Sequence, residues 1–215
     1  MKPNGRPLAL FDFDGVIWDS IDSIFLATRE LLEEGGVPLT DLPDFSTFLK
    51  RISLPSANFF RAYGINWSQT ELDKQFLEIL SLYAPLDDAY LGMASVIEQL
   101  RRRGLATAIV SGASPAYINC RLDGSGWRGL FNAVYAGVGN KTEALSACCR
   151  QFGARPAETR FVGDFKSDMR AGCAAGVRPI GFTGGHDFMI PVLKAAGAEV
   201  CVDEPEELLE VIPGR

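Results

Sequence analysis

The hydrophobic and polar positions along this chain of 215 residues change pattern twice. Residues 8–11 form a short apolar run, which predicts a buried strand. From residue 20 to about residue 83, apolar side chains recur every three or four positions, and this spacing predicts helices over residues 20–34, 44–50, 57–63 and 68–83. The last of these begins with Ser68-Gln69-Thr70-Glu71, the pattern of a capping box.

From residue 92 onward, short apolar runs alternate with helical segments. The predicted strands are residues 105–110, 133–136, 160–162, 178–182 and 200–202. The predicted helices are residues 92–103, a segment that begins at Ser114-Pro115, and residues 141–152, 168–175, 191–196 and 205–211. This alternation predicts an α/β fold with a parallel sheet that is covered by helices on both faces.

Composition narrows the class of protein. The chain is 47% hydrophobic and 22% charged, with no apolar stretch long enough to span a membrane and no signal-peptide pattern at its start, so we expect a cytoplasmic protein. A net charge of −6 argues against nucleic acid as the partner. The five cysteines lack C-x-x-C spacing and indicate neither disulfides nor zinc, and His186 alone is weak support for a Ser-His-Asp hydrolase.

Candidate chemistry begins at the end of the first apolar run, where Asp12 and Asp14 precede Gly15. Because side chains alternate along a strand, we expect both carboxylates to project from the same side of its carboxyl end. Like charges held so close repel each other unless a cation lies between them or one carries a proton. Aspartate is also an ordinary turn residue at strand ends, so the pair alone leaves both interpretations open.

Other predicted strands end in complementary groups. Ser111-Gly112 follows residues 105–110, and Asp164 and Asp168 follow residues 160–162. Each also fits a plain role in a turn or a helix cap. Lys141 is harder to explain in that way, because a cation in the first turn of a helix is disfavoured by about 0.3–1 kcal/mol, which indicates an anion nearby. Carboxylates without Cys or His neighbours are the ligands that suit Mg²⁺.

Taken in order, Asp12-x-Asp14-Gly15-Val16, Ser111, Lys141 and Gly163-Asp164-x-x-x-Asp168 resemble the four motifs of the haloacid dehalogenase superfamily of phosphohydrolases. The segment after Asp12 resembles its phosphoglycolate phosphatase and β-phosphoglucomutase branch. The resemblance implies a Rossmann-like core of residues 1–19 and 89–215 and an inserted α-helical cap domain of residues 20–88. One departure is Thr142, because the family often has prolines after the lysine of the third motif.

The resemblance also implies a function and a set of roles. It implies a Mg²⁺-dependent phosphatase that hydrolyses a small phosphorylated metabolite through an aspartyl-phosphate on Asp12. From the acidic character of the chain we expect a monomer or a weak homodimer. The implied catalytic residues are Asp12, Asp14, Ser111 and Lys141. The implied substrate-binding groups are the amides of Phe13 and Gly112 and the side chain of Arg51, and the implied metal site consists of Asp12, Asp14, Asp164 and Asp168.

Substrate specificity is expected to come from the helical insertion. Besides Arg51, Lys50 and Arg61 are candidates for contacts with a second anionic group. Four aromatic residues could form an apolar wall for the substrate, although aromatics at helical spacing equally fit a core: Trp18, Phe59, Phe60 and Tyr63.

Two alternative functions remain open. A sugar-phosphate mutase would also keep Asp14, but the resemblance implies that it would use a histidine from the cap, and residues 20–88 contain none. A catalytically inactive binding domain on the same fold is the other alternative.

Overall fold

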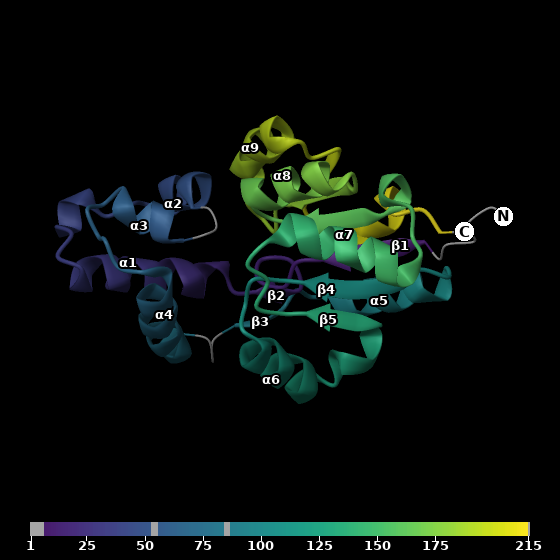
Figure 1. The fold of residues 1–215 in the computed structure, drawn as a ribbon, viewed down its shortest axis with the longest axis horizontal. Coiled ribbons are helices and arrows are strands. Elements are labelled where there is room, and N and C mark those ends of the chain that lie inside the picture. Colours follow the sequence, from purple (N-terminus) through teal and green to yellow (C-terminus); the bar gives the residue numbers. More distant parts are fainter. Residues whose placement is uncertain (1–6, 53–55, 84–86, 215) are drawn as a thin grey trace. The chain divides into compact units, whose positions relative to one another are not determined.

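A computed structural model describes residues 7–52, 56–83 and 87–214 of the chain. Six strands form one parallel sheet in the order β5-β4-β1-β6-β7-β8 (Figure 1). The strands are β1 Leu8–Phe11, β4 Ala106–Val110, β5 Ala133–Tyr135, β6 Arg160–Gly163, β7 Arg178–Phe182 and β8 Val200–Val202. The predicted parallel α/β fold is confirmed, and each predicted strand differs from the observed one by at most one residue at an end.

The order of the strands positions the candidate site. In the sheet, β1 lies between β4 and β6, which are the second and the fourth of the six strands along the chain. This is the doubly wound Rossmann order. Such folds bind ligands beyond the carboxyl ends of the strands, at the point where the order reverses. Here that point lies between β1 and β6, which end at Phe11 and Gly163.

Helices cover both faces of the sheet because the strands are apolar on both sides. Leu8 and Leu10 pack in a buried cluster with α7 and α8, whereas Ala9 and Phe11 pack with α5, α6 and α10. In Figure 1, α7, α8 and α9 lie together on one face. These helices are α5 Met93–Arg102, α6 Pro115–Ser125, α7 Lys141–Phe152, α8 Lys166–Ala175, α9 Ile190–Ala196 and α10 Leu208–Val211.

Contacts divide the chain into two compact units. The core unit comprises Met1–Trp18 and Ala89–Arg215, and the inserted unit is Asp19–Asp88. The helices of the inserted unit are α1 Ile21–Glu34, α2 Phe45–Arg51, α3 Ala57–Arg61 and α4 Gln69–Tyr83. All four helices predicted for this region are confirmed, as is the capping box, in which the Ser68 amide donates to Glu71 Oε2 at 2.8 Å and the Glu71 amide donates to Ser68 Oγ at 3.3 Å.

The interior of the inserted unit is aromatic. Phe59 contacts Phe48, Phe60 and Tyr63 with ring centroids 5.2 to 5.9 Å apart, and Phe59 and Phe60 are only 4% and 2% exposed. Trp18 is also buried and stacks on Phe13 in the core unit. For Trp18, Phe59 and Phe60 the structure therefore supports packing in a core, whereas Tyr63 is half-buried and its role stays a prediction.

Two short strands were not predicted. Trp18–Asp19 (β2) and Asp88–Ala89 (β3) form a two-stranded sheet where the chain passes from one unit to the other. A strand of two residues has too few positions for an alternating pattern, so the sequence carries no signal for it.

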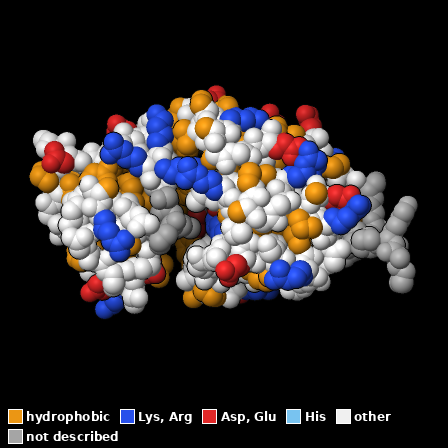
Figure 2. Space-filling view, turned by 45° about the horizontal axis from the view of Figure 1, so that its top comes forward, with side chains coloured by type: hydrophobic (Ala, Val, Ile, Leu, Met, Phe, Trp, Pro, Cys, Tyr) orange, Lys and Arg blue, Asp and Glu red, His pale blue; other side chains and the backbone are white. Residues whose placement is uncertain are grey.

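Two further features bear on possible partners. Among the described residues, no helix combines the length and the apolar character that crossing a membrane requires. On the face drawn in Figure 2, the described Lys and Arg side chains are interspersed with acidic and uncharged ones and form no single basic surface.

Candidate active site

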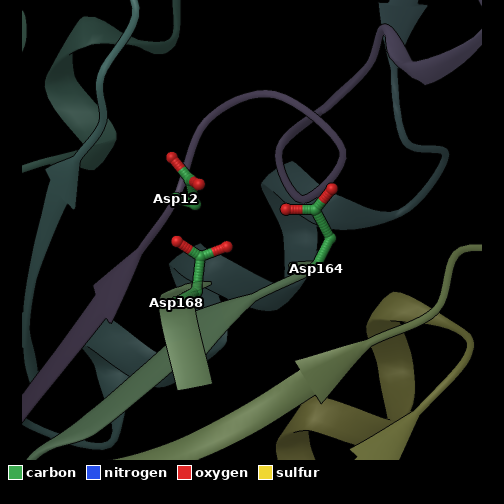
Figure 3. A group of neighbouring side chains, drawn as sticks. All are labelled: Asp12, Asp164 and Asp168. Atoms are coloured by element: carbon green, nitrogen blue, oxygen red, sulfur yellow. The ribbon is translucent and has the colours of Figure 1, made fainter. Parts of the chain in front are cut away.

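The candidate site lies at the carboxyl ends of β1 and β6. Asp12 follows β1 directly, and its amide donates to the Val162 carbonyl at 2.9 Å, which extends the pairing of the two strands by one residue. Asp164 follows β6, and Asp168 lies in the first turn of α8. Ligand oxygens of these three aspartates lie within 4.8 Å of one another, and their carboxylates face a common space (Figure 3).

Lys141 joins two of these carboxylates. Its Nζ donates to Asp12 Oδ2 and, at 2.6 Å, to Asp168 Oδ1, while the side chains of all three residues are at most 8% exposed. Lys141 is the first residue of α7, where Asn140 caps the helix by accepting from the Glu143 amide at 3.3 Å. The anion that the sequence predicted beside this lysine is therefore present, and it is a pair of aspartates.

Asp168 is held from both sides. Its Oδ2 accepts from the Phe165 amide at 3.0 Å, while Oδ1 accepts from Lys141. A Cβ atom at Gly163 would lie 2.5 Å from the Cβ of Asp168, so only glycine leaves room for this side chain. Phe165, not Asp168, is the N-cap residue of α8, so the interpretation of Asp168 as a plain N-cap is wrong.

Asp164 has a different environment. It is 8% exposed, and its Oδ1 is a buried oxygen without a hydrogen-bond partner among the described residues. A buried acceptor without a partner is costly, by about 1–3 kcal/mol, and more when it carries charge. A cation next to Asp164 would remove this cost.

Burial shifts the pKa values of this cluster. It raises the pKa of Asp12 to about 6, against the opposing effect of the Lys141 charge. Burial also raises the pKa of Asp164 well above its usual range, and the negative charges of Asp168 and Asp12 add to the rise. Burial alone would lower the pKa of Lys141, but Asp12 and Asp168 outweigh it and raise that pKa, so this side chain stays charged.

Asp14 is not one of the three aspartates whose ligand oxygens lie within 4.8 Å of one another. Because β1 ends at Phe11, Asp12 and Asp14 both lie beyond the strand, and the expectation that their carboxylates project from the same side stays a prediction. Asp14 belongs to a turn in which Gly15 has a φ of +70°. Its Oδ1 accepts from the Tyr117 hydroxyl at 3.2 Å. The sequence does not indicate Tyr117 as a site residue, because a single aromatic residue after Ser114-Pro115 carries no signal of such a contact.

The remaining predicted site residues are near strand ends or outside the core unit. Ser111 follows β4, is 2% exposed, and accepts from the Ala113 amide at 3.2 Å, while Gly112 is exposed. The Phe13 amide, expected to hold a phosphoryl oxygen, donates here to Asp12 Oδ1 at 2.8 Å. Arg51 is an exposed residue at the end of α2 in the inserted unit. The roles assigned to these residues stay predictions.

Comparison with known proteins gives the family. Residues 9–182 match the sequence model of the haloacid dehalogenase-like hydrolases. The chain is 29% identical over 206 residues to a phosphoglycolate phosphatase of Synechococcus elongatus. The alignment covers 94% of this chain and 95% of that protein.

Solved structures share the fold. A hydrolase from Pseudomonas syringae has a TM-score of 0.79 at 21% identity, and a putative β-phosphoglucomutase from Thermotoga maritima has a TM-score of 0.68 at 22% identity. Each of the two alignments covers 95% of this chain and 97% of the other. The resemblance that the four motifs carry is confirmed: the chain belongs to the family of haloacid dehalogenase-like hydrolases.

Proposed function

We propose that this hydrolase is a Mg²⁺-dependent phosphatase that cleaves a small phosphorylated metabolite through an aspartyl-phosphate on Asp12. The observation that carries the proposal is the buried Lys141 ammonium bonded to Asp12 and Asp168, with Asp164 beside them. Keeping three carboxylates and one ammonium out of water costs free energy that a purely structural site could avoid with apolar side chains. Such a cluster at a strand-order switch point is therefore best explained by chemistry.

Asp12 is the proposed nucleophile. A pKa of about 6 leaves most Asp12 side chains ionised at neutral pH, and Lys141 orients the carboxylate through Oδ2. Attack on phosphorus would form a bond between Asp12 and the phosphoryl group as the ester oxygen leaves. Asp14 would give that oxygen a proton, then take one from the water that hydrolyses the aspartyl-phosphate.

The acidic cluster fits a divalent cation. Asp12, Asp164 and the backbone carbonyl of Asp14 would hold Mg²⁺, and Asp164 Oδ1 is the buried oxygen that lacks a partner among the described residues. When bound, Mg²⁺ would screen the charge between the Asp12 carboxylate and the phosphate. Asp168 was predicted as a further ligand and belongs to the same group of carboxylates, and because its Oδ1 accepts from Lys141 we propose that it also orients that ammonium.

Phosphoryl oxygens would be held by groups at neighbouring strand ends. These are the Ser111 hydroxyl, the Lys141 ammonium, and the amides of Gly112 and Phe13. The Phe13 amide would have to exchange its bond to Asp12 for one to the phosphate. In this proposal residues 20–88 act as a cap that selects the substrate, with Arg51 as the candidate contact to a second anionic group.

A mutase is the weaker alternative. The similarity to a putative β-phosphoglucomutase supports a shared fold only, at 22% identity. The one histidine of the chain, His186, belongs to the core unit, so the inserted unit has no histidine for acid–base chemistry on a sugar phosphate. Hydrolysis therefore remains the favoured reaction. The cytoplasmic location and the oligomeric state stay predictions from the sequence.

The test is phosphate release from a panel of phosphate esters, with Mg²⁺ or with EDTA. Phosphoglycolate comes first, because it is the substrate in the name of the Synechococcus relative, followed by sugar phosphates and nucleoside monophosphates. We expect Mg²⁺-dependent release that Asp12→Asn abolishes without unfolding the protein. Wild-type turnover by folded Asp12→Asn would exclude the mechanism. If the wild-type protein releases no phosphate from any ester of the panel and does not bind Mg²⁺, an inactive binding domain would be favoured.

A further inference from the structure

Tyr117 contacts the proposed acid–base residue. Its hydroxyl donates to Asp14 Oδ1 at 3.2 Å across 103 residues of sequence. Tyr117 lies in the first turn of α6, which begins four residues beyond Ser111, and the Ser114 hydroxyl caps that turn by accepting from the Tyr117 amide at 3.2 Å. The same strand end thus supplies Ser111 for the phosphate and Tyr117 for Asp14.

The phenol ring of Tyr117 is held on two sides. The rings of Tyr117 and Phe13 pack edge to face, with centroids 5.9 Å apart and an interplanar angle of 86°. The Arg121 guanidinium lies 5.4 Å from the centroid of the Tyr117 ring and 5.1 Å from that of Trp18. Contacts of these two kinds fix the ring and therefore the direction in which its hydroxyl points.

The backbone of Asp14 is fixed by a tight turn. The Phe13 carbonyl accepts from the amides of Ile17 at 2.8 Å and Trp18 at 3.0 Å, and Gly15 supplies the positive φ that the turn needs. This turn sets where the Asp14 Cα lies. The Tyr117 hydroxyl restricts the rotation of the Asp14 carboxylate by binding one of its two oxygens.

We propose that Tyr117 is a positioning residue for Asp14, an inference that rests on the acid–base role of Asp14 in the proposed function. Oδ1 can accept from the phenol whether or not Asp14 carries a proton. In this proposal Oδ2 of Asp14 transfers the proton: it donates to the leaving oxygen in the first step and accepts from water in the second. Proton transfer depends steeply on the direction of the donor, so loss of the phenol should slow the steps that need Asp14 and leave substrate binding unchanged.

The test compares two substrates in the first turnover of Tyr117→Phe, which keeps the ring and removes the hydroxyl. An alkyl phosphate needs a proton on its leaving oxygen, whereas p-nitrophenyl phosphate has a leaving group that departs without one. In Tyr117→Phe we expect the release of the alcohol to slow by about tenfold, as measured by rapid quench in the presence of Mg²⁺. Release of nitrophenol should change by less than about twofold, and KM for both substrates should stay the same.

Three control variants separate the possible outcomes. Asp14→Asn should give the same selective loss to a larger degree, and adding Tyr117→Phe to it should cost nothing more, because the two side chains act as a unit. Tyr135→Phe is the matched control, since the Tyr135 hydroxyl donates to Gln151 on α7, and it should leave both rates unchanged.

An equal loss on both substrates, no loss, or a further loss in the Asp14→Asn background would each overturn the role of Tyr117. If Asp14→Asn itself spares the alkyl phosphate, the proposed function fails and not only this inference.

Discussion

The two units of the molecule bury different kinds of side chain. Among the described residues, every buried aspartate belongs to the core unit, and these three carboxylates gather at the ends of β1 and β6. The inserted unit buries aromatic rings and only small polar groups such as Ser23 and Thr28. Buried charge costs free energy, whereas buried aromatic surface stabilises the fold. Substitutions in the two units should therefore have different consequences.

The largest effect is expected from Lys141→Met. Without the ammonium, Asp12 and Asp168 are buried beside each other uncompensated, and we expect the free energy of unfolding at pH 7.5 to fall by about 3–5 kcal/mol in urea titrations. Phosphate release should fall by at least about 100-fold. The stability deficit should shrink at pH 5, because the pKa of Asp12 is about 6 with Lys141 present and rises further when this cation, which lowers it, is removed, so Asp12 is neutral there. Lys74→Met, at an exposed position of α4, should change stability by less than about 0.5 kcal/mol.

Phe59→Ala tests the inserted unit in the same way. Truncating this 4% exposed ring leaves a cavity beside Phe48 and Phe60, and we expect a loss of about 3–5 kcal/mol in stability. The kcat of the folded protein should fall much less than that of Lys141→Met. Leu39→Ala, at a side chain that is 70% exposed, is the control and should be nearly neutral. A loss of kcat as large as that of Lys141→Met would end the contrast between the units.

Gly163→Ala should cost less but reach the site directly. The added methyl would lie 2.5 Å from Asp168 Cβ, so Asp168 must move away from Lys141 or the backbone must shift. We expect a destabilisation of about 1–3 kcal/mol together with a clear loss of kcat. Gly124→Ala in α6 meets no atom within 4 Å and should be neutral or slightly stabilising. Full activity of Gly163→Ala would mean that the close packing of Asp168 has no part in the chemistry.

The smallest effect concerns pH and Mg²⁺. Protons compete with the cation for the same carboxylates, so calorimetric Mg²⁺ affinity should weaken as the pH falls through about 6, by up to about tenfold per pH unit. The raised pKa of Asp164 should extend this dependence to higher pH. Asp164→Asn should weaken Mg²⁺ binding and flatten its pH dependence. An affinity that is constant between pH 5 and pH 8 would argue against these carboxylates as the ligands.

Much of the fold could be predicted because its signals are local. The apolar runs of the central strands and caps such as Asn140 and Ser68 are each readable within a few residues. The two-residue strands β2 and β3 gave no pattern, and the first turn of α8 begins two residues before its prediction because Phe165 occupies the N-cap position.

The site could be predicted only in part. The order of the motifs indicated Asp12, Lys141, Asp164 and Asp168, which the fold brings together. How their carboxylates divide the hydrogen-bond donors depends on side-chain rotation in three dimensions, which no sequence pattern encodes. The same limit explains why the contact between Tyr117 and Asp14 could not be predicted.

The ammonium of Lys141 also determines how this protein reacts with acylating reagents. Only the neutral amine of a lysine is a nucleophile, and the two aspartates raise the pKa of Lys141 while its side chain is 8% exposed. At Lys166, in the first turn of α8, partial burial and the Arg170 charge lower the pKa instead. Reagents that label amines should therefore modify Lys166 more readily than Lys141, so covalent probes would distinguish the lysine bonded to Asp12 and Asp168 from the lysine at the start of α8.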